Sequence, residues 1–185
     1  MKADMEFVSS NARIPFRCQK CAECCRHVED ALMLEPLDIY RLSRYLRKQE
    51  EGVNGPEDVL DRYAHPTLIE GLPIYQLNSV GDDHACVFLK DGRCAVYDAR
   101  PQVCRMYPFG TAPGSRGKDF NFYLCTERRH HFGAGSVRVK DWLSENLFFQ
   151  LLYYLYFGYD LEKPFLPQYE ENMTALKKVL EQECG

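Results

Sequence analysis

Nine cysteines in a chain of 185 residues constrain this protein more than any other feature of its sequence. Four of them form a C-x2-C-x2-C-C run: Cys18, Cys21, Cys24 and Cys25. Two intervening residues let both thiolates of a pair face one ion, because the chain can loop round a metal with its backbone N–H groups toward the sulfurs. This run therefore predicts a metal site. The alternatives are buried or redox-paired cysteines, including a strained disulfide between the two neighbouring cysteines.

Four more cysteines follow downstream, at expected strand ends or turns: Cys86, Cys94, Cys104 and Cys125. With the first four they make eight predicted metal ligands, which suits two four-cysteine sites or one cluster of several metal atoms with shared sulfurs. Adjacent cysteines point in different directions, and this also favours a polynuclear or two-site arrangement. Cys184 stands next to the end of the sequence and is not expected to be a ligand.

The overall composition excludes several classes of protein. Charged residues make up 27% of the chain and hydrophobic residues 45%, which excludes disorder as a description of the whole. The formal net charge of -4 argues against a nucleic-acid binder. Residues 1–11 contain no apolar signal-peptide core, and the longest apolar stretch, residues 147–157, is too short to span a bilayer. We therefore expect no membrane association and a cytoplasmic protein whose thiols are reduced.

Hydrophobic periodicity and turn residues predict a series of short elements. Residues 36–50 are expected to form a helix that starts at Pro36. A short helix is expected at residues 57–64 and an edge strand containing Pro73 at residues 72–77. Residues 1–17 show little periodicity and are expected to form an arm that leads to the first cysteine.

A β-hairpin is predicted in the middle of the chain. Residues 85–90 and 94–97 are expected to pair across the turn Asp91-Gly92, which would place Cys86 and Cys94 near each other. Residues 98–104 are expected to form a turn or a short helix. A short strand at residues 121–124 is expected to deliver Cys125.

The composition changes after the glycines of residues 132–136, and two helices are predicted beyond them, at residues 142–156 and 168–183. We expect a cysteine-cluster metal-binding domain at residues 1–135 and a helical extension at 136–185 packed on it. The aromatic helix at 142–156 is a candidate homodimer face. The predicted fold is a small, metal-stapled α+β domain with a short antiparallel hairpin and about three to five covering helices.

Three signatures, taken together, resemble a known family: Cys18-x-x-Cys21-x-x-Cys24-Cys25, then Cys86-x7-Cys94-x-Val96-Tyr97, then Arg100-Pro101-x-x-Cys104-Arg105-x-Tyr107-Pro108-Phe109. The stretch from residue 17 to residue 125 resembles the CxxCxxCC, or YkgJ-type, cysteine-cluster family of zinc- or iron-chelating domains. The resemblance implies a metal cofactor. It also implies a distant relationship to a domain of flagellin lysine methylases, but the chain has no glycine-rich methyl-donor loop, so that activity is not carried over.

The metal itself is left open by the sequence. A C-x2-C-x2-C run with a remote fourth cysteine is typical of an iron–sulfur loop, and four thiolates also suit tetrahedral zinc. Iron is slightly favoured, and copper(I) is a further alternative because thiolates bind it well. The positive charges of Lys20, Arg100 and Arg105 lie beside proposed thiolates and would offset their negative charge.

A metal-binding role without catalysis is the favoured function. The alternatives are an iron–sulfur protein that transfers electrons, and a metal-dependent enzyme or accessory subunit of a modification enzyme. Asp82, Asp83 and His84 form the only acid–base cluster near a cysteine, and they are better read as a turn. His27 and His84 are alternative ligands near the cysteines. An unidentified protein partner is compatible with the sequence.

Overall fold

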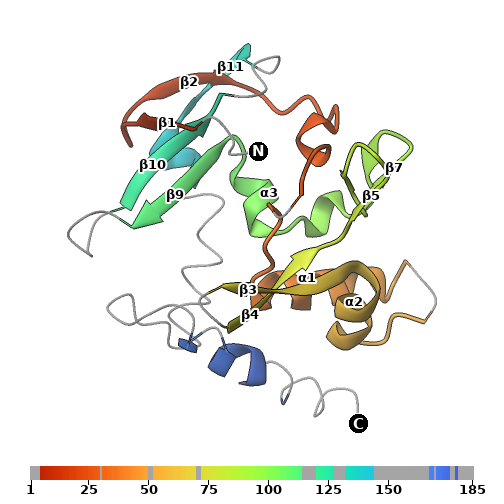
Figure 1. Ribbon diagram of the computed structural model, residues 1–185. Coiled ribbons are helices and arrows are strands. Elements are labelled where there is room, and N and C mark those ends of the chain that lie inside the picture. Colours follow the sequence, from red (N-terminus) through yellow and green to blue (C-terminus); the bar gives the residue numbers. More distant parts are fainter. Residues whose placement is uncertain are drawn as a thin grey trace.

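The computed structural model describes most of the chain, namely residues 5–29, 31–49, 52–69, 72–113, 120–126, 132–143, 167–168, 170–175 and 178. Within these residues the elements are short helices and small antiparallel sheets, so the α+β class is confirmed. Figure 1 shows the strands near the N-terminus grouped on one side of the molecule and helices α1 and α2 on the other, with α3 between them.

Helix α1, Pro36–Leu46, begins at the proline that predicted it. Ile39, Leu42 and Leu46 lie on its buried face at helical spacing. The helix ends at Leu46, earlier than the expected residue 50, and residues 47–49 form a turn. Helix α2, Pro56–Tyr63, packs against α1 and matches its predicted position.

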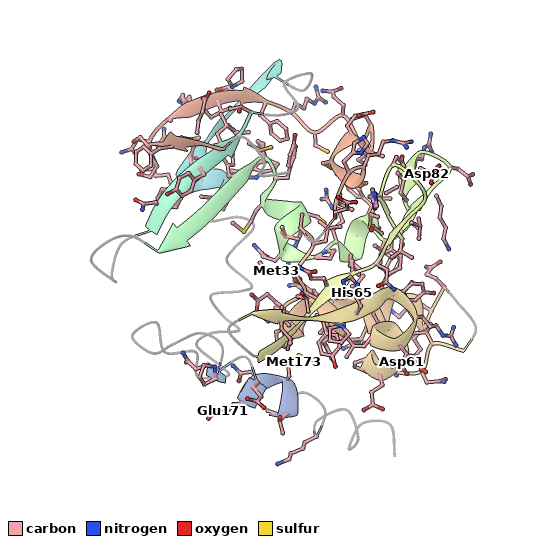
Figure 2. The ribbon with its side chains drawn as sticks, in the orientation of Figure 1. Met33, Asp61, His65, Asp82, Glu171 and Met173 are labelled. Carbon is pink, nitrogen blue, oxygen red and sulfur yellow. The ribbon has the colours of Figure 1, made fainter. Side chains whose placement is uncertain are left out.

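Strand β4, Leu72–Leu77, also lies where it was predicted and pairs with β3, Ala64–Ile69, along its whole length. Strand β3 was not predicted. The pair forms a two-stranded sheet, in which each strand is an edge and can carry a proline. One large apolar cluster joins α1, α2, β3 and β4, and Met173 from the described part of the expected C-terminal helix packs into it (Figure 2).

The expectation of an irregular N-terminal arm is wrong. Residues 5–16 contain two strands, β1 at Met5–Val8 and β2 at Arg13–Phe16. Strand β1 pairs with β10, Phe120–Cys125, which pairs in turn with β9, Phe109–Pro113. Strand β2 pairs with β11, Phe132–Arg138. These strands are too short to show clear alternation, and only their distant partners select the extended conformation.

Strand β11 crosses the expected domain boundary at residue 135. The residues after it, Val139 and Leu143, are buried in a second apolar cluster with Val8, Met106 and Phe109. The division into two domains stays a prediction. Most of the expected aromatic helix at 142–156, and with it the candidate homodimer face, lies outside the described residues.

The predicted central hairpin is present as two smaller ones. Strand β5, Ser79–Val80, pairs with β6, Ala85–Cys86, and β7, Leu89–Lys90, pairs with β8, Arg93–Cys94. The Asp91-Gly92 turn is where it was predicted. Cys86 lies opposite Ser79 and Cys94 opposite Leu89, so the two cysteines belong to two hairpins and not to the single one expected. They still lie near each other, as predicted, because the charge of Cys94 raises the pKa of Cys86. The chain turns at residues 87–88, where Val87 donates its N–H to Asn78 and ends the first hairpin.

Three further described helices lie near the cysteines and are only three to five residues long: η1 at Glu23–Cys25, η2 at Tyr97–Ala99 and α3 at Gln102–Met106. Helix α3 begins within residues 98–104, the region expected to form a turn or short helix, and ends two residues beyond it. In the part of the chain that the structure describes, no helix combines the length and apolar character needed to cross a membrane.

Candidate metal centre

Seven of the eight predicted ligands line one cavity of about 610 Å³. They come from three separate segments: the loop after β2, the two central hairpins, and α3. The seven are Cys18, Cys21, Cys24, Cys25, Cys86, Cys94 and Cys104. None of these seven cysteines forms a disulfide in the structure. Cysteines from the upstream group and from the downstream group therefore share one cavity.

The loop that carries the first four cysteines has an unusual backbone. Lys20 and Ala22 both have positive φ angles, 54° and 63°. A left-handed residue with a side chain costs about 1–2 kcal/mol and persists only where the surrounding structure fixes it. Turns of this kind can direct successive backbone N–H groups to one side, as in many anion and iron–sulfur sites. Here the turn is closed by the Cys25 N–H, which donates to the Ala22 carbonyl at 2.9 Å.

The cysteine loop is fastened to the turn at residues 81–84. His27 and Val28 donate their backbone N–H groups to the carbonyls of Asp83 and His84 at 2.9 and 3.0 Å. The side chains reinforce this attachment, because Arg26 pairs with Asp83 and His84 pairs with Glu29. The acid–base cluster of residues 82–84 is therefore a turn, as expected, and Asp82 is exposed at its tip (Figure 2).

Cys86 and Cys94 stand in matching local settings. Each sulfur accepts a hydrogen bond from the backbone N–H two residues later, from Phe88 and from Val96 respectively. Such bonds favour the thiolate, yet burial outweighs them and raises the pKa of Cys86 to about 11. Burial raises the pKa of Cys94 as well, while the nearby Arg100 guanidinium acts in the opposite direction.

Cys104 is presented to the cavity by α3, and α3 is held in place by α1. The buried Asp38 carboxylate of α1 accepts the Gln102 N–H at 2.9 Å, at the first residue of α3. It lies 3.8 Å from the Arg105 guanidinium. Burial, followed by the charges of three neighbouring cysteines, raises the pKa of Cys104 well above its ordinary value.

Five of the thiols influence one another strongly: Cys24, Cys25, Cys86, Cys94 and Cys104. The pKa of Cys25 is raised first by its hydrogen bond with Cys24, then by burial and by the charges of Cys24, Cys94 and Cys104. Without a cation, each thiolate in such a group disfavours the next. A bound metal ion reverses this balance, because it stabilises all of its thiolate ligands at once. The donor set therefore fits a soft metal.

The other two cavity cysteines, Cys18 and Cys21, are exposed at its outer side. The Tyr97 hydroxyl donates to the Cys18 sulfur at 3.9 Å. Two cations stack on the Tyr97 ring, with Lys20 Nζ at 4.5 Å and Arg100 Cζ at 3.7 Å from its centroid. The cavity thus has positive charge beside its thiols, which offsets part of the charge of a thiolate cluster.

Arg105, the third cation expected beside the thiolates, does not line this cavity. Neither do His27 and His84, the alternative ligands. Cys125 is also outside it: it ends β10, pairs with Met5 and donates its N–H to Pro108 at 2.8 Å. Its role as a ligand stays a prediction. Among the described side chains, no three His, Cys, Asp or Glu groups already stand close enough together to hold an ion.

Sequence reasoning missed the role of Asp38 and of Phe16. Asp38 occupies the third position of α1, where an acidic residue predicts helix capping. Nothing at this position in the sequence indicates a contact with α3. Phe16 lines the cavity at the end of β2 and packs edge-on against Tyr107 and Trp142, with ring centroids 6.0 and 5.6 Å away. Its place in an apparently irregular arm hid it.

Comparison with known proteins adds independent support for metal binding. The family model CxxCxxCC, described as "Putative zinc- or iron-chelating domain", matches residues 17–127. Over 98 residues the chain is 32% identical to Uncharacterized protein MJ0661 of Methanocaldococcus jannaschii. That alignment covers 52% of this chain and 46% of the relative, so the chain spans about half the length of the protein it matches. No solved structure matches the chain.

Proposed function

Because this chain belongs to the CxxCxxCC family of zinc- or iron-chelating domains, we propose that it is a metal-binding protein whose seven cavity thiols hold a polynuclear site. The observation that carries the proposal is the convergence of thiols from three separate segments on one cavity. A buried cysteine often serves only as a small apolar side chain. Here Cys18 and Cys21 are exposed, yet they line the same cavity as the buried Cys86.

The number of thiols argues for more than one metal atom. A structural zinc ion is saturated by four ligands. Seven thiols around one cavity exceed that number, and the neighbouring side chains of Cys24 and Cys25 leave in different directions. Several metal atoms that share thiolate or sulfide ligands use such a set fully.

Iron, as an iron–sulfur cluster, is the metal we propose. The first three cysteines have the spacing of an iron–sulfur loop, and Cys104 can serve as a remote fourth ligand. The stacked cations Lys20 and Arg100 suit the net negative charge of such a cluster. The cluster would crosslink the N-terminal loop, the hairpins and α3. Zinc ions bridged by the same thiolates are the alternative.

The test is purification of the full chain without oxygen, followed by metal and sulfide analysis and an absorption spectrum. We expect a brown protein that contains iron and acid-labile sulfide and absorbs at roughly 400 nm. A colourless protein with zinc at two or more atoms per chain would overturn the iron assignment and keep the polynuclear site. A protein without tightly bound metal, before and after reconstitution, would overturn the metal-binding function itself.

A further inference from the structure

A second cavity, of about 420 Å³, lies between α1 and the η2–α3 segment. Its lining is dominated by cations: Arg41, Arg44, Tyr45, Lys48, Asp98, Ala99 and Arg105. Four side chains carry positive charge and one carries negative charge, although the whole chain has a formal net charge of -4. Arg41 and Arg44 come from α1 and Lys48 from the turn after it, and the structure brings Arg105 of α3 beside them.

Two of the guanidinium groups are held in fixed positions by the protein. The Arg105 Nη2 group donates to Gln102 Oε1 at 2.8 Å and lies 3.8 Å from the buried Asp38 carboxylate. Arg44 donates to the Tyr40 hydroxyl at 2.8 Å, and its Cζ atom lies 5.6 Å from the centroid of the same ring. Arginines held in this way lose little freedom when they bind a ligand.

Arg105 also retains a hydrogen-bond donor. Its Nε–H group is buried and has no hydrogen-bond partner among the described residues. A buried donor without an acceptor costs about 1–3 kcal/mol, so an acceptor that reached it would relieve this cost. The lining of the cavity itself holds one carboxylate, that of Asp98, beside four cationic side chains.

We propose that this cavity binds the phosphate group of a small soluble ligand. Guanidinium groups match phosphate oxygens in shape and charge. A phosphate group carries a charge of about -1.5 to -2 at neutral pH, which suits an excess of several cations better than a single carboxylate does. The site is separate from the thiol cavity and does not depend on the metal assignment, although Asp98 borders both cavities and Arg105 follows Cys104 in α3.

The experiment is a calorimetric titration of the full chain, as purified, with inorganic phosphate and with pyrophosphate at constant ionic strength. We expect saturable binding at one site per chain. The double variant Arg44→Gln/Lys48→Gln should weaken it about tenfold or more, because both side chains are exposed cations that line the cavity. Arg47→Gln is the matched control: it removes an exposed charge from the end of the same helix, outside the cavity.

Several results would overturn the proposal. One is the absence of saturable binding of either phosphate compound by the wild-type chain. Another is equal weakening by Arg47→Gln, which would show diffuse attraction to surface charge. Tighter binding of citrate than of pyrophosphate would show a carboxylate site instead. Co-sedimentation with phosphatidic-acid vesicles, combined with no binding of soluble phosphate, would assign the surface to a membrane lipid.

Discussion

The buried carboxylate of Asp38 links the apolar half of the molecule to the thiol cavity. One of its oxygens accepts the Gln102 N–H at the start of α3, and the other accepts the Glu35 N–H at 3.2 Å. Burial raises the pKa of Asp38 to about 6 despite these bonds. The carboxylate therefore remains mostly ionised at neutral pH and positions the short helix that carries Cys104.

Substitution Asp38→Asn should lower the free energy of unfolding by about 2 kcal/mol at pH 7.5. An amide offers one acceptor oxygen where the carboxylate offers two, so one buried N–H group loses its partner. Urea denaturation measures the change. Asp61→Asn, an exposed position on α2, is the control and should change stability by less than about 0.5 kcal/mol. Equal effects of the two substitutions would contradict the role given to Asp38.

Glu35 gives the protein a pH dependence of its own. Burial, aided by the neighbouring Asp38 charge, raises the pKa of Glu35 to about 8 from an ordinary value near 4.5. The folded state therefore binds this proton more tightly than the unfolded state does. The contribution of Glu35 to the free energy of unfolding must fall as pH rises between about 4.5 and 8, and be constant outside that window.

The test compares wild type with Glu35→Gln at pH 5, 6.5 and 8. Gln keeps the uncharged shape at every pH, so the variant should gain stability relative to wild type as pH rises. Taking the difference between the two proteins cancels the pH dependence of metal binding, which both share. A difference that stays constant from pH 5 to 8 would rule out this titration.

Arg100 is expected to tune the thiol site. It stacks on Tyr97 and lowers the pKa of Cys94 against the effect of burial. Arg100→Gln should weaken metal binding about three- to tenfold in competition with a chelator, because Cys94 must lose its proton to become a ligand. Arg47→Gln, which is far from the thiols in sequence and does not line their cavity, should leave the affinity unchanged. An unchanged affinity in Arg100→Gln would remove the electrostatic role.

The β7–β8 hairpin shows how a local element places a thiol at the cavity. Asp91 and Gly92 have φ angles of 50° and 71°, so both central residues of the turn are left-handed, as the twist of a tight hairpin requires. The turn fixes the register that places Cys94 opposite Leu89. Local sequence chemistry alone was enough to predict this turn.

Two substitutions at Gly92 separate backbone strain from loss of contacts, because a Cβ atom there would touch nothing within 4 Å. Gly92→Val should lower the free energy of unfolding by about 1–2 kcal/mol, since a branched residue disfavours a positive φ. Gly92→Asn should cost less than half as much, because Asn tolerates this conformation. Thermal denaturation compares the two variants, and an Asn variant as unstable as the Val variant would contradict the turn geometry.

Elements with local signals were predictable from the sequence, and elements defined by distant partners were not. Proline at its first position and periodic apolar residues revealed α1. Strands β1 and β2 are four residues each and owe their conformation to β10 and β11, which follow far later in the chain. Single-sequence patterns carry no information about such pairing.

Across the whole molecule, the thiol cavity is the meeting point of its parts. It borders β2, the central hairpins, α3 and residues of the large apolar cluster such as Leu32 and Phe88. Spacing motifs in the sequence predicted all seven cavity thiols as ligands, and the structure places the seven around one cavity. These motifs could not show that Cys125 lies outside the cavity. The strand that ends at Cys125 was predicted correctly, but the neighbours of this cysteine depend on the pairing of β10 with β1.

The most direct measurement is the metal content per chain of Cys104→Ser and Cys125→Ser, purified together with wild type. Both substitutions exchange one thiol for a hydroxyl on a half-buried residue, but only Cys104 lines the cavity. Cys104→Ser should lose at least half of the metal and melt at a lower temperature, whereas Cys125→Ser should keep the wild-type metal content. Full metal occupancy in Cys104→Ser, or a loss in Cys125→Ser as large as that in Cys104→Ser, would contradict a seven-thiol metal centre.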